Sequence, residues 1–352
     1  MTSTETPWPQ IELRRRIFVY EHICGGGLAS TSLPPSLREE GEAMLRAILE
    51  DLSRLPGVEV VTTVDARLER SSFPGDVKVV GSTEESARLF LDLARSSSTI
   101  VIAPETDHVL ERQSRRVLEV GGHLLGSEPR AVAVTSDKLG TFRCLDRSGV
   151  PALPAVPLAS HTSSDRPVVL KPRFGAGSED VRLVPRGARP EPADGDFVVT
   201  PFVPGIAASV LVMVGEREVR PLVPCRQVLS DDGRFRYLGG SAPLPGAAGR
   251  LAVDLATRAV RSIPGLRGFT GVDLVMSPDE TSGLVVEVNA RLTTSYTGLR
   301  HLARNNLARC WLETWLSGTP GEPRWKEGEV SFSSSGRLLV ASGSQVSSER
   351  NL

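Results

Sequence analysis

The sequence predicts a doubly wound α/β domain followed by an α+β region, and two patterns support this division. From residue 16 to about residue 130, short apolar runs alternate with helix-length segments, as in a parallel sheet with crossover helices. From Pro167 onward, apolar runs are joined by glycine-bearing turns, and few helices interrupt them. A chain of 352 residues is long enough for two or three such domains.

The first half contains five candidate strands, at residues 17–20, 58–61, 77–80, 99–103 and 123–125. An amphipathic helix is predicted between the first two, because apolar residues recur at three- and four-residue spacing from Leu37 to Leu55 before Gly57. Thr83 is expected to cap a second helix over the same sheet. Ser136 is expected to cap a third helix, which ends near Gly149.

The second half contains five further candidate strands, at residues 168–170, 197–200, 210–214, 274–276 and 284–288. Residues 250–263 are expected to form a helix, and the spacing of Leu307, Trp311 and Trp315 indicates another, packed on the core. A hairpin is expected around residues 330–341, and the last ten residues are expected to be loose.

Composition excludes several classes of function. With 41 Lys and Arg against 42 Asp and Glu, the net charge is -1, so nucleic acid is not the expected partner. No run approaches the ~20 apolar residues of a membrane span, and the early apolar run is interrupted by charge, unlike a signal peptide. The four cysteines lie far apart, so we expect a reduced, cytoplasmic protein.

Lys171 follows an apolar strand and precedes a glycine-bearing loop. Backbone N–H groups of the loop, with Gly175, Gly177 and Ser178, can contact phosphate oxygens while the lysine supplies a positive charge. The segment does not match the G-x-x-x-x-G-K-[ST] signature, and taken alone a lysine before a glycine turn is more often part of a solvated hairpin.

Asp273, Glu287 and Asn289 lie on two neighbouring candidate strands that are joined by a short turn. Residues 287 and 289 share a strand face, so all three side chains converge if the strands pair. Three oxygen donors suit Mg²⁺, which binds through one or two carboxylates plus substrate phosphates. The alternative is a surface charge ladder that includes Glu287 and Arg291.

Lys138, Lys171 and the acidic strands together resemble the ATP-grasp superfamily over residues 130 to 318. The resemblance implies five segments: a disordered start (1–15), a Rossmann-like pre-ATP-grasp domain (16–130), a small lobe (131–200), a large lobe (201–318) and a C-terminal tail (319–352). It also implies site roles. Lys138, Lys171 and the loop of Gly175, Gly177 and Ser178 would bind ATP. The remaining implied roles are magnesium or manganese binding by Asp273, Glu287 and Asn289, and stabilisation of an acyl phosphate by Arg291.

The chain departs from the family pattern where adenine and ribose are usually bound. Thr200 and Pro201 stand where Gln or Glu usually ends the inter-lobe strand, so adenine recognition is expected from backbone groups of Val199 and Phe202. Ala207 and the residue after it replace the ribose-binding carboxylate that many members carry. Weak ATP affinity is one expected consequence.

Three stretches resemble ligases of the tyramine glutamate ligase type, which function in methanofuran or methylofuran assembly. They are the segments 20–27 (YEHICGGG), 225–240 (CRQ through YLGG) and 291–296 (RLTTSY). Glu21 and His22 end the first strand, where open α/β sheets bind ligands, so they are candidate substrate contacts. The resemblance adds Arg226, Tyr237 and Ser295 as further substrate candidates.

The leading hypothesis is an ATP-dependent ligase that joins a small carboxylate to an amine through an acyl phosphate, with glutamate and tyramine or tyrosine as candidate substrates. Lys171 and Arg291 would be its catalytic residues, and a homodimer is compatible with it. Two alternatives stay open. One is a non-catalytic ATP-binding module, and the other is a dipeptide or carboxylation-type ligase of the same superfamily.

Overall fold

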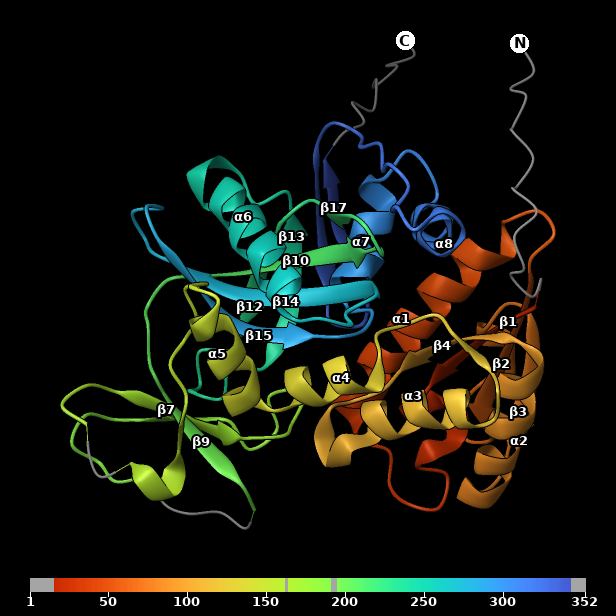
Figure 1. Cartoon of the computed structure of the whole chain (residues 1–352), viewed down its shortest axis with the longest axis horizontal. Helices are drawn as coiled ribbons and strands as arrows, with labels where there is room; N and C mark the ends of the chain where they lie inside the picture. Colours follow the sequence, from red (N-terminus) through yellow and green to blue (C-terminus); the bar gives the residue numbers. More distant parts are fainter. Residues whose placement is uncertain (1–15, 162–163, 191–194, 343–352) are drawn as a thin grey trace, which may run out of the picture.

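The computed structural model describes residues 16–161, 164–190 and 195–342, which form three sheets (Figure 1). The segments predicted to be disordered, 1–15 and the last ten residues, lie outside this range. The first sheet is parallel, with strand order β3-β2-β1-β4-β5. The predicted doubly wound fold is therefore confirmed, with strand bounds β1 (Arg16–Glu21), β2 (Glu59–Asp65), β3 (Asp76–Val80), β4 (Ser98–Ile102) and β5 (His123–Leu124).

Helices cover both faces of the parallel sheet because its strands are apolar on both faces. Ile17 and Val19 belong to one buried cluster with α1 (Pro35–Ser53), whereas Phe18 and Tyr20 pack beside α2 (Thr83–Ser96) and α3 (Val109–Glu119). The cap of α2 is Ser82, whose side chain accepts the Glu85 N–H. The prediction that Thr83 caps this helix was wrong by one residue, because Thr83 is the first residue of the helix itself.

The small lobe is a four-stranded antiparallel sheet with order β6-β9-β7-β8. Its strands are β6 (Val156–Pro157), β7 (Val168–Pro172), β8 (Arg182–Val184) and β9 (Phe197–Pro201). Two helices, α4 (Pro129–Ser136) and α5 (Lys138–Arg147), connect it to the parallel sheet. Asp137 caps α5 by accepting the Leu139 N–H, so the predicted cap at Ser136 was wrong; Ser136 ends α4 instead.

The large lobe is an eight-stranded antiparallel sheet with order β15-β14-β10-β12-β13-β16-β17, and β11 pairs with β10. Helix α6 (Gly246–Ser262) packs on one face, and α7 (Ser295–Leu302) and α8 (Leu307–Ser317) pack on the other. The predicted hairpin is present as β16 and β17, and it extends this sheet. The strand bounds are β10 (Ile206–Val214), β11 (Val219–Pro221), β12 (Cys225–Leu229), β13 (Tyr237–Ala242), β14 (Gly268–Met276), β15 (Gly283–Asn289), β16 (Glu329–Ser333) and β17 (Leu338–Ser342).

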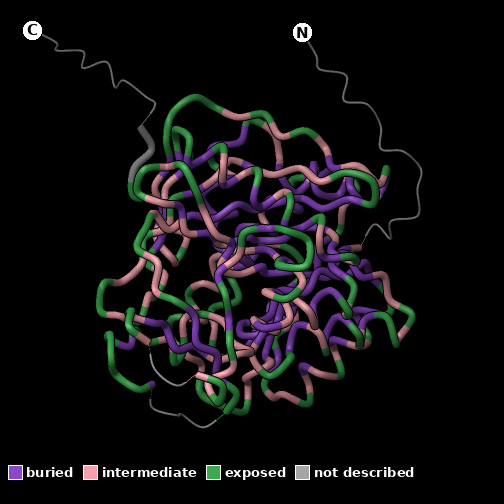
Figure 2. The backbone as a smooth tube through the Cα atoms, turned by 60° about the vertical axis from the view of Figure 1, so that its left-hand side comes forward, coloured by how far each residue is buried: buried purple, intermediate pink, exposed green. Residues whose placement is uncertain are grey.

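Helix α1 joins the parallel sheet to the large lobe. Asp51 on α1 accepts hydrogen bonds from Arg300 Nη2 at 2.6 Å, Arg300 Nε at 3.0 Å and the Tyr296 hydroxyl at 2.6 Å. Figure 2 shows buried residues concentrated in the interior of the molecule and exposed residues along the outer turns. This junction fixes α7, and with it the residues that precede α7 in the cavity described below. No helix within the described residues is both long and apolar enough to span a bilayer.

Candidate active site

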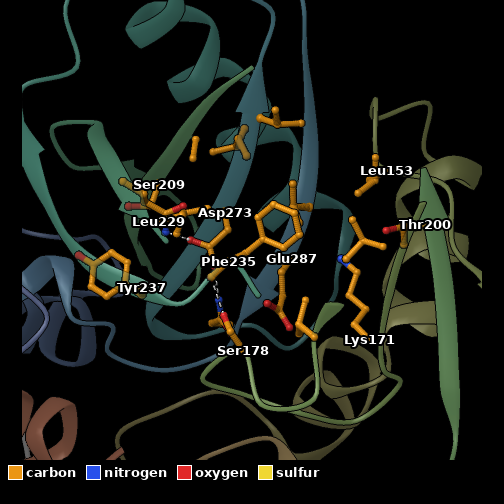
Figure 3. A pocket seen from close by; sticks show the side chains of 18 of the residues that line it. Leu153, Lys171, Ser178, Thr200, Ser209, Leu229, Phe235, Tyr237, Asp273 and Glu287 are labelled. Atoms are coloured by element: carbon orange, nitrogen blue, oxygen red, sulfur yellow. Dashed lines mark hydrogen bonds between the residues drawn. The ribbon is translucent and has the colours of Figure 1, made fainter. Parts of the chain in front are cut away.

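A cavity of about 600 Å³ lies between the two lobes. Strands β7 and β9 supply one wall, β10, β14 and β15 supply the other, and the loop after β7 also lines it. Figure 3 shows Lys171 and Thr200 on one side and Tyr237 on the opposite side, with Asp273 and Glu287 between them. The cavity therefore brings together residues that are separated by more than one hundred positions in the chain.

The two predicted phosphate-binding lysines line the cavity together with Glu287, and the charges of both act on its carboxylate. Lys138 is the first residue of α5, and its Nζ lies 3.1 Å from Glu287 Oε1 and donates to the Gly175 carbonyl at 2.9 Å. Lys171 is buried on β7, and this burial lowers its pKa to about 8, although the charge of Glu287 acts in the opposite direction. Two cations held within one cavity are suited to an anionic ligand such as a polyphosphate.

The three predicted metal ligands also come together. Asp273 on β14 lies opposite Glu287 on β15, and Asn289 Nδ2 donates to Asp273 Oδ2 at 2.9 Å. Gln227 on β12 donates to Asp273 Oδ1 at 2.8 Å. Burial and the charge of Glu287 raise the pKa of Asp273 to about 7. Burial acts in the same direction on Glu287, but the charges of Lys138 and Lys171 outweigh it and lower the pKa of Glu287.

This donor set fits a hard divalent cation. Asp273 and Glu287 offer carboxylate oxygens, and Asn289 donates through its amide nitrogen, which leaves its carbonyl oxygen available. Burial and the neighbouring charge of Glu287 raise the pKa of Asp273, and a bound Mg²⁺ would favour its ionised form. Within the described residues, no three His, Cys, Asp or Glu side chains form a metal-binding group, so the amide and substrate phosphates would complete the coordination.

The glycine loop after β7 reaches the N-terminal domain. Gly177 has φ +68°, and a Cβ built there would lie 2.6 Å from Leu37 on α1, so glycine is required for this approach. The Phe174 ring lies 4.5 Å from the His108 ring, centroid to centroid. Ser178 Oγ donates to the Phe235 carbonyl at 2.9 Å. These contacts hold the loop over the cavity, where Gly175, Gly177 and Ser178 all form part of the lining.

The predicted adenine contacts differ from the observed geometry. Val199 lies in the centre of its sheet, paired with both β6 and β7, and is not among the residues that line the cavity. Phe202 lines the cavity as expected, but its N–H already donates to the Pro167 carbonyl at 3.0 Å, which leaves its carbonyl as the backbone group for a ligand. Thr200 instead lines the cavity, and its buried hydroxyl has no hydrogen-bond partner within the described residues. A side chain that the sequence marked only as a departure thus lines the cavity and lacks a hydrogen-bond partner among the described residues.

Arg291 is held by Glu105, a residue that the sequence alone did not mark as functional. Its Nε and Nη2 donate to the two carboxylate oxygens of Glu105 at 2.9 and 3.1 Å, and Glu105 is buried while Arg291 is largely shielded from water. Burial opposes the charge on Arg291, but Glu105 outweighs it and raises the arginine pKa. Glu105 follows β4 at the carboxyl edge of the parallel sheet, and its position after an apolar strand was the available signal.

The five candidate substrate contacts separate into two groups. Arg226, Tyr237 and Ser295 line the cavity. Glu21 and His22 do not: the Glu21 carboxylate accepts the Cys24 N–H at 2.6 Å, and His22 Nδ1 lies 3.1 Å from the Tyr20 hydroxyl. Both are buried, Glu21 against Gly41 of α1 and His22 beside Tyr20, so neither of them lines this cavity. Strand β1 ends where it was expected to end, but helix α1 covers its last residue, Glu21.

Two protein-family models match two successive parts of the chain. An ATP-grasp domain model matches residues 135–295, and a pre-ATP-grasp domain model matches residues 58–132. The chain belongs to the ATP-grasp superfamily. A solved ATP-grasp superfamily structure from Archaeoglobus fulgidus is similar with TM-score 0.68 and 26% identity, covering 90% of this chain and 91% of that one.

Other ATP-grasp proteins indicate the type of reaction. The tyramine–L-glutamate ligase of Methanocaldococcus fervens is 24% identical over 81% of this chain and 89% of its own length, and that of Methanocaldococcus jannaschii is 23% identical over 64% and 65%. An L-amino acid ligase from Bacillus licheniformis shares the fold, with TM-score 0.65 and 16% identity over 90% of this chain and 78% of its own. The chain is an ATP-binding ligase that forms carbon–nitrogen bonds.

Proposed function

We propose that this ligase activates a small carboxylate as an acyl phosphate and transfers the acyl group to an amine, with Mg²⁺ as cofactor. The observation that carries the proposal is the meeting of Lys138, Lys171 and Glu287 in one cavity, with Asp273 and Asn289 beside them. Such an arrangement neutralises a triphosphate and needs no covalent nucleophile from the protein.

In this proposal, Lys138 and Lys171 hold the ATP phosphates and the glycine loop covers them. Magnesium, held by Asp273, Glu287 and Asn289, would supply the charge that phosphoryl transfer requires. Lys138 now pairs with Glu287, so ATP binding would draw the lysine toward the phosphates and free that carboxylate. Such an exchange couples ATP binding to exposure of a metal ligand.

Arg226 is suited to bind the substrate carboxylate. It is exposed on β12, lines the cavity and has no acidic partner within ion-pair distance among the described residues. The methanogen relatives carry names that join tyramine to L-glutamate. Glutamate with tyramine, and glutamate with tyrosine, are therefore the first substrate pairs that we propose.

The experiment measures ADP release by the purified chain with Mg²⁺ and ATP, with each carboxylate and amine alone and in pairs, and detects the amide by mass spectrometry. We expect product only when both partners are present, and a loss of about 100-fold or more in Glu287→Gln. Asp254→Asn, which also changes a carboxylate to an amide but on the exposed face of α6, is the matched control. ATP binding without turnover over a broad substrate panel would favour the non-catalytic module, and normal activity of Glu287→Gln would refute the site.

A further inference from the structure

Glu40 occupies a distinctive place in the cavity. It lies on α1, and among the described residues that line the cavity it is the sole contribution of the N-terminal 130 residues. It belongs to the end of the cavity that includes Thr294, whose hydroxyl lies 3.5 Å from Glu40 Oε2. The parallel-sheet domain therefore places one carboxylate at the reaction site.

Among the described residues, no lysine or arginine lies within ion-pair distance of the Glu40 carboxylate. The guanidinium whose charge acts on it, that of Arg291, is bound through two hydrogen bonds to Glu105. The other polar and charged groups that act on it are Ser36 and Glu39 on its own helix and Tyr237 on β13. Burial raises the pKa of Glu40 to about 7. A half-buried carboxylate of this kind is suited to a cation supplied by a ligand.

The two ends of the cavity match the two stages of the proposed reaction. Lys171 lies away from Tyr237 in Figure 3, with Asp273 and Glu287 between them, and the charge of Glu40 acts on both Tyr237 and Arg291. If phosphate is transferred beside Lys171, the acyl carbon lies toward Arg291, and the amine must approach from the side of Glu40. We propose that Glu40 binds the ammonium group of the incoming amine and accepts a proton from it, which rests on the ligase function proposed above.

In this proposal Glu40 completes the proton balance. An alkylammonium carries three protons on nitrogen, and the amide product keeps one. Glu40 takes the first proton, which frees the lone pair that attacks the acyl carbon. The carbon–nitrogen bond forms, the bond from the acyl carbon to the phosphate oxygen breaks, and the second proton leaves with the departing phosphate. Glu40 then returns its proton to solvent. The substrate class is therefore a cationic primary amine.

The test compares Glu40→Gln with Glu39→Gln, which makes the same change one residue away on the exposed face of α1. Hydroxylamine serves as a second acceptor, because it is largely uncharged at neutral pH and needs no base to become nucleophilic. We expect Glu40→Gln to lower kcat/KM for tyramine by at least 30-fold at pH 7, while hydroxamate formation and the KM for ATP change less than twofold. Glu40→Asp should restore part of the activity, and Glu39→Gln should match the wild type.

The outcomes separate the two proposals. No amine-dependent turnover by the wild type would refute the ligase function, and the role of Glu40 with it. Turnover by the wild type with unchanged tyramine kinetics in Glu40→Gln would overturn the role of Glu40 alone. Equal losses of hydroxamate and amide in that variant would also overturn it, because Glu40 would then serve carboxylate activation or folding and not the amine.

Discussion

Replacing Glu105 by glutamine tests whether the buried pair with Arg291 positions that arginine for catalysis. Both carboxylate oxygens of Glu105 accept hydrogen bonds from Arg291, at 2.9 and 3.1 Å. Glutamine has nearly the same shape, but only its carbonyl oxygen can accept. One of the two bonds is therefore lost, and an amide N–H faces a guanidinium N–H in its place.

The size of the effect follows from the burial of the pair. The side chains of Arg291 and Glu105 are only 14% and 3% exposed, so water does not replace the missing partner. A hydrogen bond to a charged group contributes about 1.5–3 kcal/mol, and breaking a buried pair costs on the order of 3–5 kcal/mol of stability. If the lost bond also sets the arginine in the transition state, kcat falls about 10- to 100-fold.

The assay measures kcat and the KM for ATP in Glu105→Gln, with urea unfolding of the same samples. We expect the KM for ATP to stay within about twofold, because Arg291 would act on the acyl phosphate and not on ATP binding. Asp254→Asn changes a carboxylate to an amide in an exposed pair with Arg258, and it should cost no more than about 0.5 kcal/mol. Unchanged kcat in a folded Glu105→Gln protein would refute the reasoning.

Three further perturbations follow from the structure. Asp51→Asn removes the charge that holds Arg300 between α1 and α7, so urea unfolding should show a loss on the order of 3 kcal/mol, and no loss would contradict a structural role for this junction. His22 has a pKa lowered to about 4 by burial, below the usual 6.5, so the unfolded state binds the proton first and stability falls as pH drops from about 6.5 to 4, by on the order of 3 kcal/mol. His22→Gln should lack this pH dependence and keep the wild-type KM values; a raised substrate KM would place His22 at the substrate after all. Thr200→Val removes a buried, unpartnered hydroxyl, so it should weaken ATP binding about five- to tenfold in calorimetry without lowering the unfolding midpoint, and unchanged affinity would exclude Thr200 from the ATP site.

The sequence predicted the fold well where apolar spacing is periodic. The strands of the parallel sheet and helix α1 were found because their buried residues recur at the spacing that each element requires. Helix caps were less accurate. At Ser82 and Asp137, neighbouring residues could also cap, and only the backbone conformation decides which side chain reaches the free N–H groups. Helix α7 was not predicted, because eight residues give too few repeats of the helical period.

The candidate site was predictable where its residues sit on regular strands. Asp273 and Glu287 were expected to meet because pairing of adjacent strands places them opposite each other. Glu105 and Glu40 could not be found in this way, since a loop brings Glu105 to Arg291 and a helix of another domain brings Glu40 to the cavity. Conversely, the position of Glu21 at a strand end was recognised, but its burial under α1 depends on the approach of Gly41, which no local pattern reveals.

The central claim is that the cavity activates a carboxylate as an acyl phosphate. The most direct measurement uses a substrate carboxylate labelled with ¹⁸O, ATP, Mg²⁺ and the amine, followed by mass spectrometry of the inorganic phosphate. The account predicts that one labelled oxygen moves from the carboxylate to the phosphate in each turnover, and that Lys171→Ala abolishes both the transfer and the amide. Amide formation with unlabelled phosphate would contradict the account.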